Sequence, residues 1–175
     1  MKRQCSICGS TQFLARTEDK CLNCLTSNRI PGDYFIGIDP DIKNSGFALY
    51  NLKERKLELV ANYSFFDLLK KFNELKDKIS LVRIEAGWLN KKSNFHNRPG
   101  QSKEAGEKIA SNVGANAETG RKIAEMCDSL NIPYELVKPL GTKNIDSKLF
   151  KRITGYTKRT NQDSRDAAML VWDYK

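Results

Sequence analysis

The chain has few features of a membrane or secreted protein, and it is poor in histidine. No apolar run among its 175 residues approaches the roughly 20 residues that a bilayer crossing needs. Its start, Met-Lys-Arg-Gln-Cys, lacks the apolar stretch of a signal peptide, so we expect a cytoplasmic protein without a membrane partner. The only histidine, His96, lies in a polar stretch, and we assign it no role.

Internal repeats, low-complexity segments and a glycine-rich phosphate-binding loop are also missing. Without that loop, and with too few residues for two lobes, the chain does not resemble an actin-like ATPase. Hydrophobic residues make up 39% of the sequence, which is enough for a buried core in a chain of this length. The mean hydropathy of -0.57 indicates a soluble protein. We therefore expect one modest domain with a small appendage.

Basic residues are in excess, which gives a net charge of +9 and favours a polyanionic partner. Two segments carry much of this excess. The first has seven basic residues against the single acid Asp146: Lys138, Lys143, Lys148, Lys151, Arg152, Lys158 and Arg159. The second has five against Glu104 and Glu107: Lys91, Lys92, Arg98, Lys103 and Lys108. Either segment, taken alone, also fits an ordinary solvated surface.

Four cysteines near the start form two close pairs, Cys5 with Cys8 and Cys21 with Cys24. The spacing C-x2-C-x12-C-x2-C is typical of a zinc ribbon, in which four thiolates enclose one structural Zn²⁺ ion. A disulfide pair or four free thiols are the alternatives, and disulfides are rare in a cytosolic chain. We expect a ribbon over residues 1–32 and a second domain over 33–175. Cys127 lies in an amphipathic stretch and is expected to be a packed core thiol.

The hydrophobic pattern predicts an α/β domain with five strands and four helices. The predicted strands are Tyr34–Asp39, Ser45–Tyr50, Lys56–Tyr63, Leu81–Glu85 and Pro133–Val137. The predicted helices are Phe65–Ile79, Ser102–Leu130, Ile145–Ile153 and Asp163–Tyr174, and the second allows a break near Gly114–Asn116. The first three strands have short links, so they should be antiparallel. Gly87–Gln101 is predicted to be a polar loop.

Four acidic residues stand at informative points of this pattern. Asp39 and Glu85 each end a predicted buried strand, and Asp163 and Asp166 open the last helix. A carboxylate at the end of a buried strand is costly unless a cation meets it, and divalent metal ions are the obvious partners. Each residue also has a simpler explanation: a turn cap for Asp39, an ion pair for Glu85, and helix-surface charges for the other two. Asp41, Asp146 and Asp173 are expected on the solvated surface.

The element order and the acidic positions resemble the ribonuclease H-like superfamily, and within it the RuvC-type Holliday junction resolvases, particularly small phage-type ones. Gly37-Ile-Asp39-Pro40, followed by Ser45-Gly-Phe47, is similar to the family's first-strand motif. Ile84-Glu85 with Trp88 is similar to the strand-four motif, and Asp163-x-x-Asp166-Ala-Ala to the terminal helix motif. The motifs span residues 34 to 173. Asp41 stands where the family usually has glycine, and the ribbon is not part of the bacterial enzyme.

The resemblance implies a ribonuclease H-like mixed five-stranded sheet flanked by helices, with an active site made by the four carboxylates. Two Mg²⁺ (or Mn²⁺) ions would lie there, roughly 4 Å apart, bridged by Asp39. The implied activity is that of a crossover-junction endodeoxyribonuclease in DNA recombination and repair, which cuts four-way or other branched DNA and leaves 5′-phosphate ends. Lys143 or Lys148 would contact the scissile phosphate. Trp88 would stack on an unpaired base, or else anchor its loop.

Two strands of a four-way junction must be cut, and a homodimer with twofold symmetry offers two sites at a fixed spacing. The long helix over 102–130 is the candidate interface, unless it only packs on the sheet. Two other functions stay open. One is a nuclease of the same fold that acts on RNA or mobile-element DNA. The other is a catalytically inactive module whose zinc ribbon binds DNA, although clustered acids near phosphate would not help a pure binder.

Overall fold

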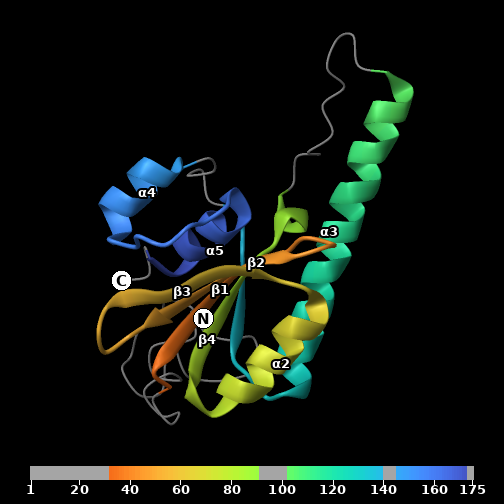
Figure 1. Cartoon of the computed structure of the whole chain (residues 1–175). Coiled ribbons are helices and arrows are strands. Elements are labelled where there is room, and N and C mark those ends of the chain that lie inside the picture. The colour runs from red at the N-terminus through yellow and green to blue at the C-terminus, as the bar shows by residue number, and fades with distance from the viewer. Residues whose placement is uncertain (1–31, 91–101, 140–144, 173–175) are drawn as a thin grey trace, which may run out of the picture.

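The computed structural model describes residues 32–90, 102–139 and 145–172. The N-terminal cysteines, Lys143, His96 and Asp173 lie outside these residues, so the ribbon and its zinc stay predictions. The elements are β1 (Tyr34–Asp39), β2 (Ser45–Asn51), β3 (Lys56–Tyr63), α2 (Phe65–Leu75), η1 (Lys76–Lys78), β4 (Ile79–Glu85), η2 (Gly87–Leu89), α3 (Lys103–Ser129), β5 (Tyr134–Val137), α4 (Ser147–Thr154) and α5 (Gln162–Trp172) (Figure 1).

The five strands form one mixed sheet in the order β3-β2-β1-β4-β5. The first three strands pair antiparallel, as their short links predict, whereas β4 pairs parallel to β1 and β5 parallel to β4. A parallel pair needs a crossover connection, and α2 and α3 supply the two that are required here. The sheet order and the flanking helices are consistent with the ribonuclease H-like fold expected from the sequence.

Strand residues alternate between two cores, one on each face of the sheet. On one face Ile36, Ile38 and Ile84 pack with α2 and α3. On the other face Phe35 and Leu81 pack with residues of α4 and α5. Figure 1 shows α5 crossing the sheet on the side opposite α2. Neighbouring residues of a strand point to opposite faces of the sheet, so a residue's place in this alternation decides which helices its side chain contacts.

Three helices begin at side-chain caps that the sequence supplies. Ser64 Oγ accepts from Asp67 N at 3.3 Å at the start of α2, and Ser102 Oγ accepts from Ala105 N at 3.3 Å at the start of α3. Asp146 Oδ1 accepts from Leu149 N at 2.8 Å at the start of α4. This bond lowers the pKa of Asp146 below its usual value, because the amide hydrogen bond favours the ionised carboxylate. Asp146 is exposed as expected, but it also caps a helix.

The structure corrects two predictions about helix limits. The helix predicted over Phe65–Ile79 ends at Leu75, and Ile79 instead begins β4, where it pairs with Tyr34 of β1. At Ile79, pairing with β1 in the sheet therefore outweighs the helical spacing of apolar residues. Helix α3 runs unbroken from Lys103 to Ser129, without the break allowed near Gly114–Asn116. None of the helices in the described ranges combines the length and apolar composition that a membrane crossing requires.

Candidate active site

The acidic ends of β1 and β4 lie side by side on one face of the sheet. Asp39 pairs with Gly46 of β2, and Glu85 pairs with Val137 of β5. Both residues come one position after Ile38 and Ile84, which face each other across the parallel pair β1·β4. Because Ile38 and Ile84 belong to the core beneath α2 and α3, Asp39 and Glu85 are on the opposite face, the face that α5 covers. Glu85 is buried and Asp39 is half-buried.

Two glycines bring α5 directly onto this face. A Cβ atom on Gly37 would lie 2.0 Å from the carbonyl oxygen of Ala167, and one on Gly46 would lie 2.1 Å from that of Asp163. Any side chain at either strand position would therefore push the helix away from the sheet. Since Gly46 is the strand partner of Asp39, the first turn of α5 is held over the end of β1. The backbone of Asp163, a residue predicted from the helix motif, therefore lies over the end of β1, where Asp39 stands.

Asp163 lies in an electrostatically unfavourable place for a carboxylate. Burial raises the pKa of Asp163 above its usual value, and the negative charges of Asp41 and Asp166 raise it further. Arg165 and a backbone hydrogen bond act in the opposite direction, but they do not cancel these effects. Asp166 is one helical turn along α5 and is also half-buried. Crowded, partly desolvated acids of this kind mark candidate functional sites.

The donor set suits a hard divalent cation such as Mg²⁺, because carboxylate oxygens are its preferred protein ligands. A cation would also relieve the repulsion at Asp163. Within the described ranges, no three or more histidine, cysteine, aspartate or glutamate side chains form a group already arranged to hold a metal ion. The oxygen chemistry of these residues suits a metal ion, and the side chains would have to move closer together to bind one.

The turn between β1 and β2 contains a carboxylate that sequence reasoning left on the surface. Asp41 is half-buried, and its Oδ1 accepts hydrogen bonds from Lys43 N at 2.9 Å and Asn44 N at 3.3 Å. Helix α3 reaches this turn through Asn116, whose Oδ1 accepts from Ile42 N at 3.0 Å. The Asn116 amide also donates to Asp41 Oδ2 at 3.4 Å. The only advance signal was that Asp41 replaces a glycine usual in the resembled family.

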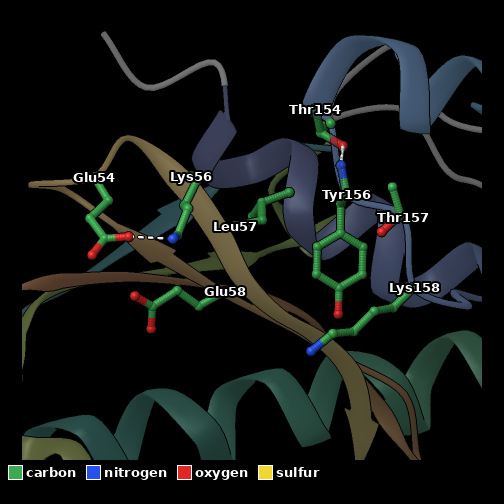
Figure 2. A pocket seen from close by; sticks show the side chains of 9 residues that line it. Glu54, Lys56, Leu57, Glu58, Thr154, Tyr156, Thr157 and Lys158 are labelled. Atoms are coloured by element: carbon green, nitrogen blue, oxygen red, sulfur yellow. Dashed lines mark hydrogen bonds and ion pairs between the residues drawn. The ribbon is translucent and has the colours of Figure 1, made fainter.

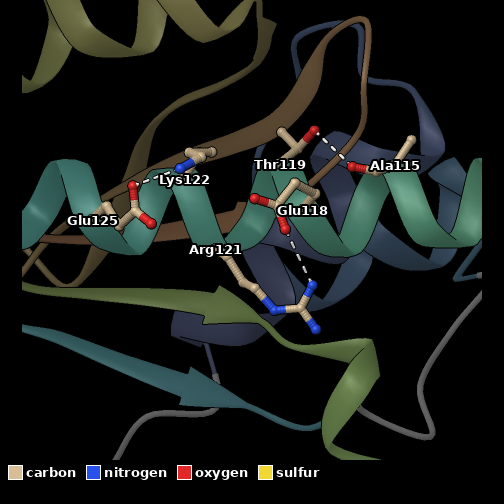
Figure 3. A network of polar contacts seen from close by, with 6 residues as sticks. All are labelled: Ala115, Glu118, Thr119, Arg121, Lys122 and Glu125. Carbon is tan, nitrogen blue, oxygen red and sulfur yellow. Dashed lines mark hydrogen bonds and ion pairs between the residues drawn. The ribbon is translucent and has the colours of Figure 1, made fainter.

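Trp88 packs against α3 instead of standing free in its loop. A Cβ atom on Gly120 would lie 2.7 Å from the Trp88 ring and 3.1 Å from Pro40, so α3 holds the segments that follow both β1 and β4. The guanidinium of Arg121 lies 5.1 Å from the centre of the Trp88 ring, a cation–π contact. Figure 3 shows Arg121 reaching from α3 toward the segment after β4 while pairing with Glu118 at 3.3 Å. These contacts are those expected if Trp88 anchors its loop. Base stacking by Trp88 stays a prediction.

Basic side chains stand beside α5 on α4. Lys148 is exposed in the first turn of this helix, and Lys151 and Arg152 are exposed in its last turn. The apolar side of α4 is fixed by the buried ring of Phe150, so its charged side faces solvent. Arg165 ties α5 to the segment just before α4 by donating from Nε to the carbonyl oxygen of Ile145 at 2.8 Å. Lys143, the other predicted phosphate contact, lies outside the described residues.

Two pockets have linings that include none of the four predicted carboxylates. One, of about 450 Å³, is lined by charged residues of β3 and by the segment after α4, as Figure 2 shows. Lys56, which lines this pocket, pairs with Asn51 of β2, and Asn51 pairs with Tyr34, the first residue of β1. Asp39 is the last residue of β1, so the pocket lies at the end of the sheet opposite to Asp39. The second, of about 430 Å³, is an apolar groove between Ile42, Phe65 and α3.

No protein-family model matches the chain, and no curated protein matches it in sequence. Among solved structures, Thermus thermophilus RuvC in complex with a Holliday junction is 14% identical, with 79% of this chain and 90% of that one covered and a TM-score of 0.48. The yeast mitochondrial Holliday junction resolvase Ydc2 is 12% identical, with 91% and 86% covered and a TM-score of 0.36. A propionate kinase from Francisella tularensis is 16% identical, with 61% and 37% covered and a TM-score of 0.37. At these values none decides an activity, which has to be inferred from this chain's own residues.

Proposed function

We propose that the protein is a metal-dependent, structure-specific DNA endonuclease that resolves Holliday junctions or related branched DNA. The observation that carries the proposal is the placement of Asp39, Glu85 and Asp163 on one face and at one edge of the sheet. Three separate elements supply these carboxylates, and α5 adds Asp166 one turn further. The motifs around these positions resemble those of RuvC-type resolvases, which supports a junction as the substrate.

Asp39, Glu85, Asp163 and Asp166 would hold two Mg²⁺ or Mn²⁺ ions. When bound, such ions activate water and stabilise the leaving 3′ oxygen in phosphodiester hydrolysis, which leaves a 5′-phosphate. The chain itself contributes the rigid strand ends that fix Asp39 and Glu85, and the close packing of α5 that holds Asp163 over the Asp39–Gly46 pair. Burial beneath α5 also limits water around these groups, which strengthens electrostatic interactions within the site.

Exposed cations of α4 would hold the DNA backbone beside the acidic groups. Lys148 and Lys143 are the candidates for the contact with the scissile phosphate, and of these only Lys148 lies within the described residues. Lys151 and Arg152 extend the basic side of α4. Such contacts bind phosphate without reading sequence and weaken as salt rises. The N-terminal zinc ribbon, with Cys5, Cys8, Cys21 and Cys24 as ligands, would be a structural appendage to this nuclease domain.

The junction would be cut by a homodimer with twofold symmetry, which places two active sites on opposed strands. The proposed interface is the N-terminal half of α3, which extends beyond the sheet in Figure 1. Ile109 and Val113 are 47% and 45% exposed there. A second copy that covers these apolar side chains would remove them from water, which would stabilise the dimer.

The decisive experiment is cleavage of a synthetic four-way junction in Mg²⁺, beside a linear duplex, a Y-fork and an RNA–DNA hybrid. Symmetric nicks near the branch point are expected with wild type. Asp39→Asn and Glu85→Gln should abolish cleavage, because each removes a charge from the proposed site, but they should keep junction binding. Preferential cutting of the hybrid would instead indicate an RNA-directed nuclease. Binding without any cleavage in Mg²⁺ or Mn²⁺ would leave only the DNA-binding module.

A further inference from the structure

A hydrogen-bonded chain on α5 leads from Asp166 to an arginine. Gln162 Nε2 donates to Asp166 Oδ1 at 2.8 Å, across one helical turn. Arg165 Nη2 donates to the side-chain oxygen of the same glutamine, Gln162 Oε1, also at 2.8 Å. All three residues are half-buried, so water competes less for these bonds than it would on an open surface. Gln162 was not a candidate in the sequence, since no motif includes it.

The chemistry of the two neighbours fixes which way the Gln162 amide points. A guanidinium has only donors, so the amide oxygen must face Arg165. The amide nitrogen is then directed at Asp166, whose carboxylate accepts. The opposite orientation would set oxygen against oxygen at one end and nitrogen against nitrogen at the other. A single orientation therefore satisfies both contacts.

Arg165 is itself held by the chain that precedes α5. Its Nε donates to the Ile145 carbonyl oxygen at 2.8 Å. Its Nη1 lies 3.3 Å from both the carbonyl oxygen and the hydroxyl of Thr160. The guanidinium thus has three separate points of attachment, and the planar fork keeps them at fixed angles. One of these points lies just before α4, the helix that carries Lys148.

We propose that Gln162, oriented by Arg165, is a positioning residue that holds the Asp166 carboxylate in its working orientation. The proposal rests on the proposed nuclease function, in which Asp166 helps to hold the metal. An aspartate on a helix surface has several rotamers, and the bond from Gln162 selects among them. Partners that orient metal-ligating carboxylates typically change metal affinity or activity by about 10–100-fold when removed. Arg165 would also keep Asp166 in register with the basic helix α4.

The test uses Gln162→Met, Arg165→Lys and the double variant, with Lys122→Met on the outer surface of α3 as control. Gln162→Met keeps the length of the side chain and removes both hydrogen bonds. Arg165→Lys keeps the charge but loses the fork that joins Ile145 to Gln162. For each variant we would measure kcat for junction cleavage, junction affinity without divalent cation, melting temperature, and Mn²⁺ binding without DNA by calorimetry.

Gln162→Met is expected to lower kcat about 10–100-fold and to weaken Mn²⁺ binding, with junction affinity and melting temperature close to wild type. The double variant should lose no more kcat than the more damaging of the two single variants, because both changes break one chain of contacts. A merely structural role would instead lower the melting temperature and junction affinity together with kcat. Wild-type cleavage and Mn²⁺ binding by Gln162→Met, or losses that follow the melting temperature, would overturn the proposal.

Failure of the nuclease function would be distinguishable from failure of this inference. If wild type cuts no substrate but binds Mn²⁺, the proposed function falls, and weaker Mn²⁺ binding by Gln162→Met still supports the positioning role. Equal Mn²⁺ binding by the two proteins would then overturn it. If wild type neither cuts DNA nor binds Mn²⁺, both proposals fall.

Discussion

At the scale of single residues, Asp163 shows how a fold can hold a group that weakens it. The close approach of α5 to Gly46 buries this carboxylate beside Asp41 and Asp166, and both neighbours are negative. A residue chosen for stability alone would be neutral here. Proteins keep such groups where an ionised side chain serves binding or catalysis. The same repulsion would draw a divalent cation to the end of β1.

Asp163→Asn is therefore expected to stabilise the protein at neutral pH in the absence of divalent cations. Because the pKa of Asp163 is raised in the folded state, the folded protein holds its proton to higher pH than the unfolded chain does. Stability then falls as pH rises from the unfolded value, about 3.9, through the raised folded value, and the full penalty is present at pH 7. Thermal melts from pH 3 to pH 7 would measure the difference between variant and wild type.

The difference in melting temperature should be largest at pH 7, should vanish below the unfolded pKa, and should narrow when Mg²⁺ is added. Asp77→Asn, a change at an exposed position of η1, serves as the control and should melt like wild type. A stabilisation by Asp163→Asn that is the same at every pH would contradict an electrostatic cause.

At the scale of elements, α3 acts as a clamp on the loops that follow the acidic strand ends. Asn116 binds the turn after β1 through the Ile42 amide and Asp41. One turn later, Gly120 leaves room for Trp88 and Pro40, which follow β4 and β1. The positions of Asp39 and Glu85 thus depend on a helix that carries none of the four proposed catalytic carboxylates.

Replacement of Gly120 by alanine tests this clamp. The added methyl group would meet the Trp88 ring at 2.7 Å, so the ring or the helix must shift. Overpacking of this kind costs about 1–3 kcal/mol, which exceeds the gain of up to about 1 kcal/mol from replacing a helical glycine. We expect a lower free energy of unfolding in urea, and slower junction cleavage because the strand ends move.

Gly114→Ala is the matched control on the same helix, since a Cβ atom there meets nothing within 4 Å. It should raise stability by about 0.5–1 kcal/mol and leave cleavage unchanged. If both alanine variants were stabilised alike, the contact between Gly120 and Trp88 would not be a constraint in solution.

At the scale of the whole molecule, the two faces of the sheet have different tasks. One face packs α2 and the C-terminal half of α3 into the larger core, and the other carries α5, α4 and the acidic residues. The N-terminal half of α3 belongs to neither layer and extends past the sheet. Its exposed apolar side chains are the reason to expect a second copy there.

The combined substitution of Ile109→Glu and Val113→Glu should convert the proposed homodimer to a monomer, because it places charges on the apolar surface that the second copy would cover. Sedimentation velocity over a range of protein concentrations would measure this. Ile153→Glu on α4, at a position 41% exposed, is the control and should stay dimeric. The proposed interface would be wrong if wild type sediments as a monomer at all concentrations, or if the double variant stays dimeric.

The sequence by itself determined the element order and the placement of the acids along it. Short apolar runs indicated the strands that end at Asp39 and Glu85, because strands packed on both faces are apolar along most of their length. The short links fixed the antiparallel pairing of the first three strands. Ser102 stands at the predicted start of its helix and caps α3, although Ile79 shows that strand pairing can override helical periodicity.

Only the tertiary structure decided which residues surround these acids. Asp41 influences Asp163 because the turn after β1 folds toward the first turn of α5, and Gln162 faces Asp166 because Arg165, anchored on Ile145 and Thr160, fixes its amide. Trp88 is held by α3 because Gly120 lacks a side chain at the point of contact. The Asp41 and Trp88 contacts join residues of different elements. The Gln162–Asp166 bond lies within α5, but it depends on the contacts of Arg165 with Ile145 and Thr160 outside that helix. Local sequence patterns encode the periodicity of one element, whereas the distance between two elements is set by how all of their side chains pack together.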